Sequence, residues 1–426
     1  MIKLNHLSAG EAARRIAAGK LSSEELVAAH LDRIRQRDGE VQAWVHCNPD
    51  AALAQARKVD QNKIQGPLAG VPVGFKDVID TVDMPTGYNS PIYRNYTPRI
   101  DAACAAMVRR AGGIVLGKTV TTEFASRTPG PTRNPLNLAH TPGGSSSGSA
   151  AAVADFMAPL AFGTQTGGST IRPAAYCGIV GYKPSFGTIN RAGLKQLAES
   201  LDTIGVMART VEDCALLTYA VSARPLPDFA TALAQAPRIG LFRTTRWQDA
   251  APAAQGALEN AAAVLAKKGA HVSEISLPAE FDRLYEDQIM IMNFEAARAL
   301  AHERFTHPEL LSEYLRNKLE EYWNKPRAPY SEAMRRAQDC RRMFVQPFAD
   351  IDVLLTLGAP GEAPQGITGT GNSVFNRMWT LLGAPCVTVP AGTGPQGLPL
   401  GVQIVGAYDD DERVLRLAEW IRQALA

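Results

Sequence analysis

The segment TPGGSSSGS, residues 141–149, and the segment GTQTGGSTIRP, residues 163–173, hold the densest clusters of glycine and serine in the chain. Stretches of this composition usually act as flexible linkers. Here they are flanked by alanine-rich, apolar sequence at 150–160 and 174–181, which must be buried, and a flexible linker does not belong in a core. Because glycine permits close approach and unusual dihedral angles, we interpret both segments as backbone held against something small.

The chemistry that these segments indicate is nucleophilic attack by a serine. A Gly-Gly-Ser with free N–H groups is suited to hold an oxyanion next to a serine nucleophile. Such a serine needs a base, because its hydroxyl is barely ionised near neutral pH. No histidine stands in a convincing setting, so a lysine is the next candidate. Lys76 follows the apolar run 70–75, where desolvation would lower its pKa from about 10.4 toward neutrality. Taken alone, it also fits an exposed residue at the end of a strand.

Apolar runs alternate with amphipathic stretches along most of the chain. Strands are predicted at 70–77, 114–116, near 180, and at 239–242, 272–277, 353–355, 386–389 and 401–405. Helices are predicted at 101–111, at 251–268 and at the C-terminus. Near the N-terminus, Ser8 with Glu11 and Ser22 with Glu25 match the capping-box spacing. The alternation predicts an α/β fold, a single large domain whose mixed β-sheet is covered by helices on both faces.

Three regions differ in character within this single domain, 1–426. Residues 1–60 are expected to form N-terminal helices, and 61–220 contain both glycine-serine segments and form the expected catalytic core. Residues 280–348 are charged, aromatic and helical in period, with almost no strand signal. We expect this stretch to be a helical excursion beside the sheet that shapes the substrate pocket, although helical stripes of this kind are more often plain core.

The overall composition is that of a globular protein without a strong charge. The chain has 426 residues, 46% of them hydrophobic and 20% charged, which provides a large core. Lys and Arg number 44 and Asp and Glu 42, giving a net charge of +2, and this argues against a dedicated nucleic-acid or membrane-surface protein. Six scattered cysteines and an N-terminus without a signal sequence predict a cytoplasmic protein with reduced thiols and no metal site.

Residues 112–119, GGIVLGKT, match the spacing of a phosphate-binding P-loop. That loop must stay flexible between a strand and a helix, so that its N–H groups can wrap phosphates. Here the interior is Ile-Val-Leu, which favours a strand, and it follows a predicted helix. We therefore expect no nucleotide site.

Two other motifs lack the context that their chemistry needs. GSSSG, residues 144–148, matches the nucleophile elbow GxSxG with Ser146 as nucleophile, but loop precedes it, and His271, His302 and His307 stand in no recognisable setting. His302 and His307 would lie about 140° apart around a helix, too far to share a metal as HExxH requires. We therefore expect neither a catalytic nucleophile at Ser146 nor a metal site at His302 and His307.

The two clusters and Lys76 belong to a longer ordered set of motifs. The set comprises GPLAG (66–70), FKD (75–77), GKT (117–119), EF (123–124), GGSSSGS (143–149), GGS (167–169), YKP (182–184), SLDTIG (200–205), GAP (383–385), VPAG (389–392) and LPLGVQ (398–403). In this order the motifs resemble the amidase signature family of serine hydrolases, closest in detail to its malonamidase-like members. The resemblance covers nearly the whole chain and implies the fold of that family.

The resemblance implies a Ser-cisSer-Lys triad that needs neither cofactor nor metal. Ser169 matches the nucleophile, Ser145 the bridging serine held in a cis peptide, and Lys76 the base. Neutral Lys76 would accept a proton from Ser169 through Ser145 as Ser169 attacks the amide carbonyl, and water would then hydrolyse the acyl-enzyme. The implied oxyanion hole consists of the N–H groups of Thr166, Gly167, Gly168 and Ser169.

Several positions depart from the pattern common in the family. Gln165 replaces an aspartate that many members carry, and Ser147 often a glycine. Members related to the amidotransferase A subunit usually have Arg two residues after the nucleophile, but here Arg172 stands three residues after Ser169, as in the malonamidase branch, in which the arginine holds a substrate carboxylate. We hypothesise that Arg172 binds an anionic group of a small acid amide. The alternative is a structural ion pair beside the site.

The leading interpretation is a stand-alone amidohydrolase that cleaves the C–N bond of a linear small-molecule amide, which carries a carboxylate if Arg172 acts as suggested. We expect no nucleic-acid or membrane partner and leave a homodimer open. The alternative is an A-type glutaminase subunit of a tRNA-dependent amidotransferase, which hands ammonia to partner proteins; the net charge, Gln165 and Arg172 weigh against it. A binding protein that has lost catalysis is a third option, against which the intact Lys76, Ser145 and Ser169 argue.

Overall fold

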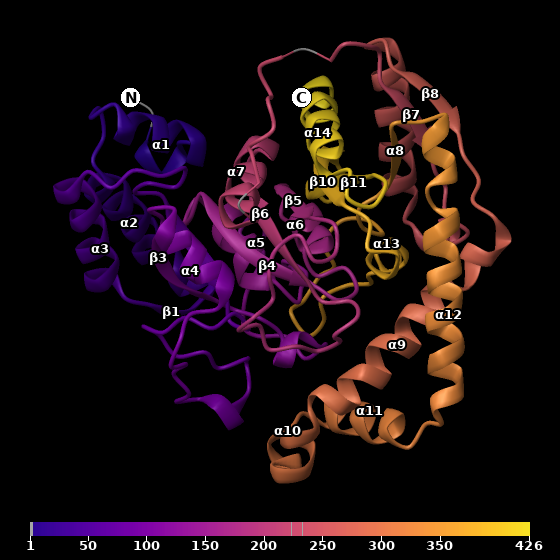
Figure 1. Ribbon diagram of the computed structural model, residues 1–426, viewed down its shortest axis with the longest axis horizontal. Helices are drawn as coiled ribbons and strands as arrows, with labels where there is room; N and C mark the ends of the chain where they lie inside the picture. The colour runs from indigo at the N-terminus through magenta and orange to yellow at the C-terminus, as the bar shows by residue number, and fades with distance from the viewer. Residues whose placement is uncertain (1–2, 223, 232) are drawn as a thin grey trace.

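An eleven-stranded mixed β-sheet runs through the molecule (Figure 1). The structure is a computed structural model and describes residues 3–222, 224–231 and 233–426. The strands are β1 (Trp44–Cys47), β2 (Pro72–Lys76), β3 (Ile114–Thr119), β4 (Leu160–Gln165), β5 (Val180–Lys183), β6 (Thr203–Ala208), β7 (Arg238–Leu241), β8 (His271–Glu274), β9 (Val353–Leu357), β10 (Cys386–Thr393) and β11 (Pro399–Val405). Their order is β1-β3-β2-β4-β6-β5-β10-β11-β9-β7-β8. β2 pairs parallel with β3 and β4, whereas β10 pairs antiparallel with β5 and β11. The prediction of a mixed sheet is confirmed.

Helices cover both faces of the sheet, as predicted. They are α1 (Ala9–Ala17), α2 (Ser23–Val41), α3 (Pro49–Asn62), α4 (Ala103–Arg110), α5 (Ser147–Ala154), α6 (Ile171–Tyr176), α7 (Val211–Ser222), α8 (Pro252–Lys267), α9 (Leu284–Ala299), α10 (Ala301–Thr306), α11 (Glu313–Trp323), α12 (Arg327–Met343), α13 (Arg377–Leu382) and α14 (Asp411–Leu425). Alternate residues of a strand point to opposite faces. In β3, Val115 therefore joins the core that contains α4 and α7, whereas Ile114 and Leu116 pack with α2 and α3.

The structure differs from the sequence prediction at some element ends. The strand predicted at 272–277 stops at Glu274, because β8 is the edge strand and its only partner, β7, ends at Leu241. Residues 1–60 contain the short strand β1 as well as helices. Ser22 and Glu25 form the predicted capping box. Ser8 caps α1 alone, because the Glu11 carboxylate pairs with arginines of the same helix.

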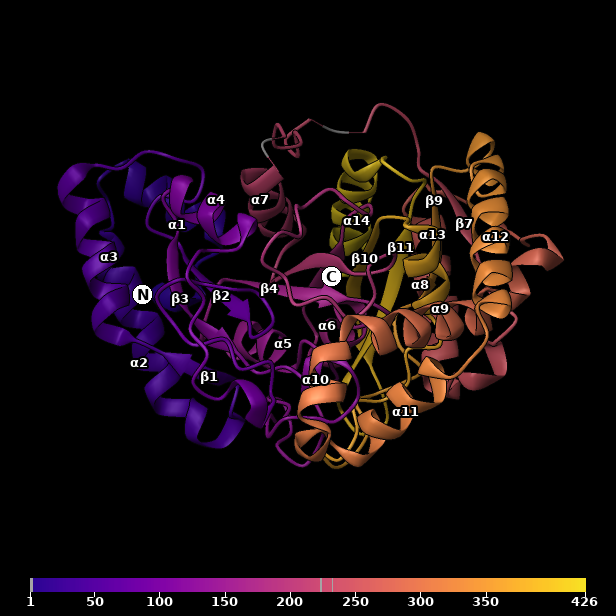
Figure 2. The same ribbon diagram turned by 60° about the horizontal axis from the view of Figure 1, so that its bottom comes forward.

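The segment 280–348 is helical along most of its length, in α9, α10, α11 and α12 (Figure 2, orange). These helices, which we call the helical arm, lie at the opposite end of the molecule from α2 and α3 (Figures 1 and 2). Leu315 and Leu319 of α11 and Phe294 of α9 are buried in the largest hydrophobic cluster. α9 and α11 of the arm are therefore packed against the body through apolar side chains.

Two sequence predictions concern the chain as a whole. Within the described ranges, no helix combines the length and apolar character that crossing a bilayer requires. All six cysteines lie in described parts of the chain and are unpaired thiols, as predicted, and five of them are buried.

Candidate active site

Lys76 is the last residue of β2, a strand with parallel neighbours on both sides. The side chain is fully buried, and Nζ lies 2.7 Å from both Ser145 Oγ and Thr164 Oγ1. Desolvation lowers the pKa of Lys76 to about 7; the positive charge of Arg172 acts in the same direction, whereas Asp202 opposes it. A base with a pKa near 7 is present in its neutral form in a large fraction of molecules at neutral pH.

Ser145 lies in the loop before α5 and follows a cis peptide bond from Gly144. The next residue, Ser146, is tied to the sheet, since its hydroxyl donates to the carbonyl of Thr164 and accepts from the Thr164 N–H. The loop that carries Ser145 is thereby held directly beside β4. The structure thus brings Lys76 and Ser145 together, although they are distant in sequence.

Ser169 lies in the loop between β4 and α6, and the side chain of Gln165 organises this loop. Its Oε1 accepts the N–H groups of Thr170 (3.0 Å) and Ile171 (3.1 Å), directly after Ser169. Its Nε2 donates to Thr380 Oγ1 (2.9 Å), leaving the hydroxyl hydrogen of Thr380 free to bind the carbonyl of Gly167. The glutamine that replaces the family's aspartate therefore has a use for its amide donor.

Three consecutive carbonyl groups of the loop, those of 166–168, accept hydrogen bonds from the protein. The donors are Gln288 Nε2 (2.7 Å), Thr380 Oγ1 (2.9 Å) and the Arg172 N–H (3.0 Å). Among the described residues, none accepts a hydrogen bond from the N–H groups of Gly167, Gly168 or Ser169. Carbonyls that are paired and N–H groups that are free form the arrangement expected of an oxyanion hole.

Gly168 is required by close packing against the residue before α13. A Cβ atom at this position would lie 2.4 Å from Asn376 Oδ1, and Asn376 is itself held by its hydrogen bond to the Gly358 carbonyl. A side chain at 168 would therefore push the loop away from α13. This contact explains one glycine of the cluster without invoking flexibility.

A cavity of about 530 Å³ opens at this loop, a volume in the range of small-molecule sites. Ser169 lines the cavity, whereas Lys76 and Ser145 are buried and are not among the lining residues. The helical arm contributes further lining residues, namely Tyr285, Ile289, Met292, Asn293 and Ala296 of α9 and Tyr314, Leu315, Lys318, Leu319 and Tyr322 of α11. A molecule bound in the cavity would meet Ser169 on the sheet side and the arm on the other.

Arg172 connects the two glycine-serine segments. Its Nη2 donates to the carbonyl of Gly144, directly before Ser145, and to Thr370 Oγ1 (3.3 Å). The side chain lines the cavity and is buried. Both partners are neutral, so the ion pair considered as the structural alternative is not formed with either of them. The hypothesis that Arg172 also binds a substrate anion stays a prediction.

The motifs that sequence context argued against have structural roles. Lys118 of the P-loop-like segment is buried in β3, where its ammonium donates to Thr86 Oγ1 (2.8 Å) and to the Ile79 carbonyl. The rings of His302 and His307 pack edge to face with centroids 5.7 Å apart. No group of three or more His, Cys, Asp or Glu side chains suited to a metal is found in the described part of the chain.

Sequence reasoning missed the residues that support the loop and those that line the cavity. The missed residues are Thr164, Gln288 and Thr380, which hold the lysine and the loop, and Arg127 and Arg377, which line the cavity. The partners of the first three lie 88 to 213 positions away along the chain. No spacing of residues in the local sequence predicts such contacts, so only the tertiary fold identifies them.

Hydrolysis of an amide bond is the chemistry that a serine in this loop and a desolvated lysine support, and it makes the protein an amidohydrolase. A family model described as Amidase matches residues 25–415. The chain therefore belongs to the amidase family, whose members share the Ser-cisSer-Lys triad and the acyl-enzyme. The finer likeness to malonamidases stays a prediction.

Relatives and solved structures of similar sequence support this placement. The chain is 36% identical to the A subunit of the glutamyl-tRNA(Gln) amidotransferase of Roseiflexus castenholzii, over 98% of this chain and 96% of the relative. It is 34% identical to the protein of the same name from Marinobacter nauticus, over 99% and 98%. A crystal structure described as that of an amidase superimposes with a TM-score of 0.90 at 28% identity, over 99% and 100%.

The expectation of a stand-alone amidohydrolase that acts on a small-molecule amide is wrong. The expectation that the chain has no nucleic-acid partner, with a homodimer left open, is wrong as well. Eight curated relatives, 33–36% identical, all carry the name of the A subunit of glutamyl-tRNA(Gln) amidotransferase. Gln165, Arg172 and the net charge weighed against an amidotransferase subunit, but each of these observations has another cause. Gln165 and Arg172 bind loop backbone, so their identity reports on the scaffold. A near-neutral charge argues against direct nucleic-acid binding, but not against membership of an assembly in which a different subunit binds it.

We predict that the rate at which a fluorophosphonate labels Ser169 rises with pH up to about 7 and then levels off. Lys76 must be neutral to accept a proton, and its pKa is lowered to about 7, so each pH step below that value reduces the active fraction. The measurement is the second-order labelling rate between about pH 5 and 9. A rate that is flat down to the acid end of this range would contradict a role for Lys76 as base.

We predict that Thr380→Val lowers kcat for amide hydrolysis about 10- to 100-fold and changes KM little. The substitution keeps the shape but removes the hydroxyl between Gln165 and the Gly167 carbonyl, so the loop loses its orientation. Thr380→Ser keeps the hydroxyl and is the matched control. Unchanged kcat in Thr380→Val would show that this hydrogen bond does not position the loop.

Proposed function

We propose that this chain is the A-type glutaminase subunit of a glutamyl-tRNA(Gln) amidotransferase, which hydrolyses glutamine and passes ammonia to a partner protein. The observation that carries the proposal is the identity of 33–36% to eight relatives of that name, aligned over 95–98% of their own length. The chemistry of the amidase family supports it, because the release of ammonia from glutamine is the hydrolysis of a primary amide.

In the proposed reaction the hydroxyl of Ser169 loses its proton through Ser145 to neutral Lys76, while its oxygen attacks the carboxamide carbon of glutamine. The N–H groups of 166–169 hold the oxyanion that forms. When the intermediate collapses, the C–N bond breaks, and the proton returns from Lys76 through Ser145 to the leaving nitrogen, which departs as ammonia. Water then attacks the acyl-enzyme by the same proton route and releases glutamate.

The position of Lys76 supports a base that both takes and returns a proton. Its Nζ contacts the hydroxyl of Ser145 at 2.7 Å, and burial lowers its pKa to about 7. A group with a pKa near the working pH exchanges a proton without a large barrier in either direction. In this proposal Thr164, at 2.7 Å on the other side of Nζ, orients the amine toward Ser145.

The proposal also assigns roles to regions and partners. Residues 61–220 act as the catalytic core, and the helical arm forms the outer wall of the substrate cavity. An amidotransferase with an A subunit has further subunits, and we propose that one of them binds the tRNA, because a net charge of +2 offers this chain little attraction to phosphates. Aminoacyl-tRNA is used in the cytoplasm, which is where the proposed function places the chain.

We predict that Ser169→Ala separates the two halves of the reaction. Co-expressed with the remaining subunits, the variant loses glutamine-dependent amidation of Glu-tRNA(Gln) by about a thousandfold or more, because the nucleophile is absent. Ammonium chloride supplied directly restores amidation to the wild-type rate, since the transfer step takes place on a different subunit. The measurement is the amount of Gln-tRNA(Gln) formed with each nitrogen donor.

The matched control is Ser147→Ala, which removes a hydroxyl from the same cluster that has only a 3.4 Å hydrogen bond to the Ser145 carbonyl. This control should keep glutamine-dependent activity. If the wild-type chain hydrolyses glutamine no faster with its partners than alone, and the assembly forms no Gln-tRNA(Gln), the proposed function is wrong.

A further inference from the structure

We propose that Arg377 and Arg127 form a carboxylate-binding subsite in the cavity that Ser169 lines, and that this subsite selects amide substrates by a negative charge and not by an ammonium group. The inference rests on the proposed function, because it identifies which part of glutamine the cavity reads. It concerns residues outside the family motifs found in the sequence.

The charge of the cavity lining is the first argument. Four cationic side chains line the cavity, those of Arg127, Arg172, Lys318 and Arg377, and no Asp or Glu does so among the described residues. Burial lowers the pKa of Arg172 to about 10; Tyr176 opposes this shift, whereas the charges of Arg377 and Arg127 contribute to it. Arg172 and Arg377 are desolvated and repel each other, and buried cations of this kind are stabilised when an anion enters.

The second argument is that the guanidinium of Arg377 is only partly used by the protein. Nη1 donates to Gln288 Oε1, while Nε is buried without a hydrogen-bond partner among the described residues. A guanidinium offers five N–H donors in a planar fork that matches a carboxylate. The unsatisfied Nε of Arg377, in a guanidinium that lines the cavity, is therefore suited to a carboxylate ligand.

Arg377 is also close to the reacting loop. Gln288 binds the Arg377 guanidinium with its Oε1 and the Thr166 carbonyl with its Nε2. A Cβ atom at Gly167, two residues before Ser169, would lie 3.5 Å from Arg377 Nη1. A carboxylate on Arg377 therefore fits a short substrate, such as glutamine, whose carboxamide lies at Ser169.

Aromatic rings hold both arginines at the cavity. The guanidinium of Arg377 lies 5.5 Å from the ring centre of Tyr285, and that of Arg127 lies 5.3 Å from the ring centre of Tyr314. The two tyrosines come from α9 and α11 of the helical arm. Ring faces attract cations, so the arm itself fixes the positions of the two charges.

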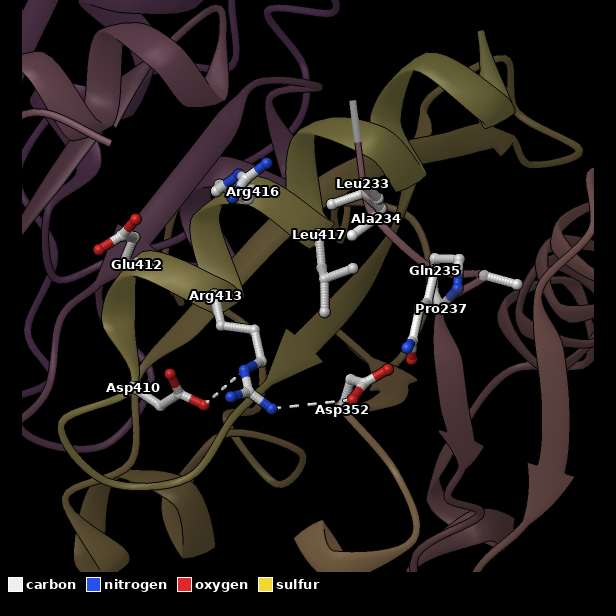
Figure 3. A pocket seen from close by; sticks show the side chains of 11 residues that line it. Leu233, Ala234, Gln235, Pro237, Asp352, Asp410, Glu412, Arg413, Arg416 and Leu417 are labelled. Carbon is white, nitrogen blue, oxygen red and sulfur yellow. Dashed lines mark ion pairs between the residues drawn. The ribbon is translucent and has the colours of Figure 1, made fainter. Parts of the chain in front are cut away.

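A second cavity of the molecule also contains arginines, but one of them differs from those beside Ser169 in how its charge is compensated. This cavity lies between residues 233–237 and α14 (Figure 3). There, however, Arg413 pairs with Asp410 at 3.1 Å and with Asp352 at 3.7 Å (dashed in Figure 3). That arginine is compensated by carboxylates of the protein itself, whereas the arginines beside Ser169 line a cavity without acidic side chains.

The same lining predicts which group of the substrate the cavity does not recognise. The ammonium group of glutamine would find only neutral acceptors, such as the side chains of Asn293, Asn372 and Ser373. A carboxylate would have stabilised that group more strongly, because charge-assisted hydrogen bonds are the stronger ones. We therefore expect glutaramate, which is glutamine without the amino group, to bind about as well as glutamine.

The test uses glutarate, a dicarboxylate without an amide, titrated calorimetrically into the Ser169→Ala form of the full chain. Arg377→Gln and, separately, Arg127→Gln should each weaken glutarate binding by about tenfold or more, because each removes a charged donor. Arg127 is exposed at the cavity, so its variant tests the proposal even if Arg377→Gln fails to fold. Arg246→Gln is the control, since Arg246 lies 4.6 Å from the Tyr285 ring without lining the cavity.

A kinetic comparison separates recognition from loop support. With Ser169 intact and the partner subunits present, Arg377→Gln should raise KM for glutamine and leave kcat and the KM for L-glutaminamide nearly unchanged. Equal losses for both substrates, or glutarate binding equal to that of the control, would overturn the subsite. Because glutarate binding needs no turnover, failure of glutamine hydrolysis in the wild type would refute the proposed function alone.

Discussion

Burial of the Lys76 ammonium removes it from water; among the described residues no carboxylate forms an ion pair with it, and the charge of Asp202 opposes only part of the effect of burial. Its two close contacts are hydroxyls, those of Ser145 and Thr164, each at 2.7 Å. Loss of the proton removes the free-energy cost of a buried charge, so burial favours the neutral amine of Lys76. The neutral amine is the form that can accept a proton as a base. β2 lies between the parallel strands β3 and β4, which fixes the backbone from which this buried side chain extends.

The rest of the site is arranged around this buried amine. Gln165, Thr380 and Gln288 bind the carbonyl and N–H groups of the loop that carries Ser169, and Arg172 joins that loop to the one that carries Ser145. The supporting donors come from α6, α9 and α13 as well as from β4, so the helical arm holds the loop as well as lining the cavity. Small changes in the position of α9 would therefore reach the loop of Ser169 through Gln288.

Much of the fold and part of the site follow from local sequence. The apolar runs at 114–116 and 386–389 lie in β3 and β10, so the P-loop-like segment contains the strand that its Ile-Val-Leu interior predicted. The Gly-Ser segments located the loops of Ser145 and Ser169, because glycine is needed where backbone packs closely, as Gly168 does against Asn376. Arg377 and Thr380 could not be found in this way, since nothing near them in sequence marks the loop they contact. Arg172 and Gln165 misled the choice between a stand-alone amidohydrolase and an amidotransferase subunit, because both side chains bind loop backbone and such contacts do not distinguish the two functions.

The charge state of Lys76 is the claim that a single measurement tests most directly. NMR of the protein labelled with ¹³C-lysine would follow the Cε resonance of Lys76, assigned by its absence from Lys76→Met, as the pH is raised. The account predicts a titration centred near pH 7, well below that of the exposed lysines. A Lys76 resonance that shows the protonated form up to about pH 9 would contradict it.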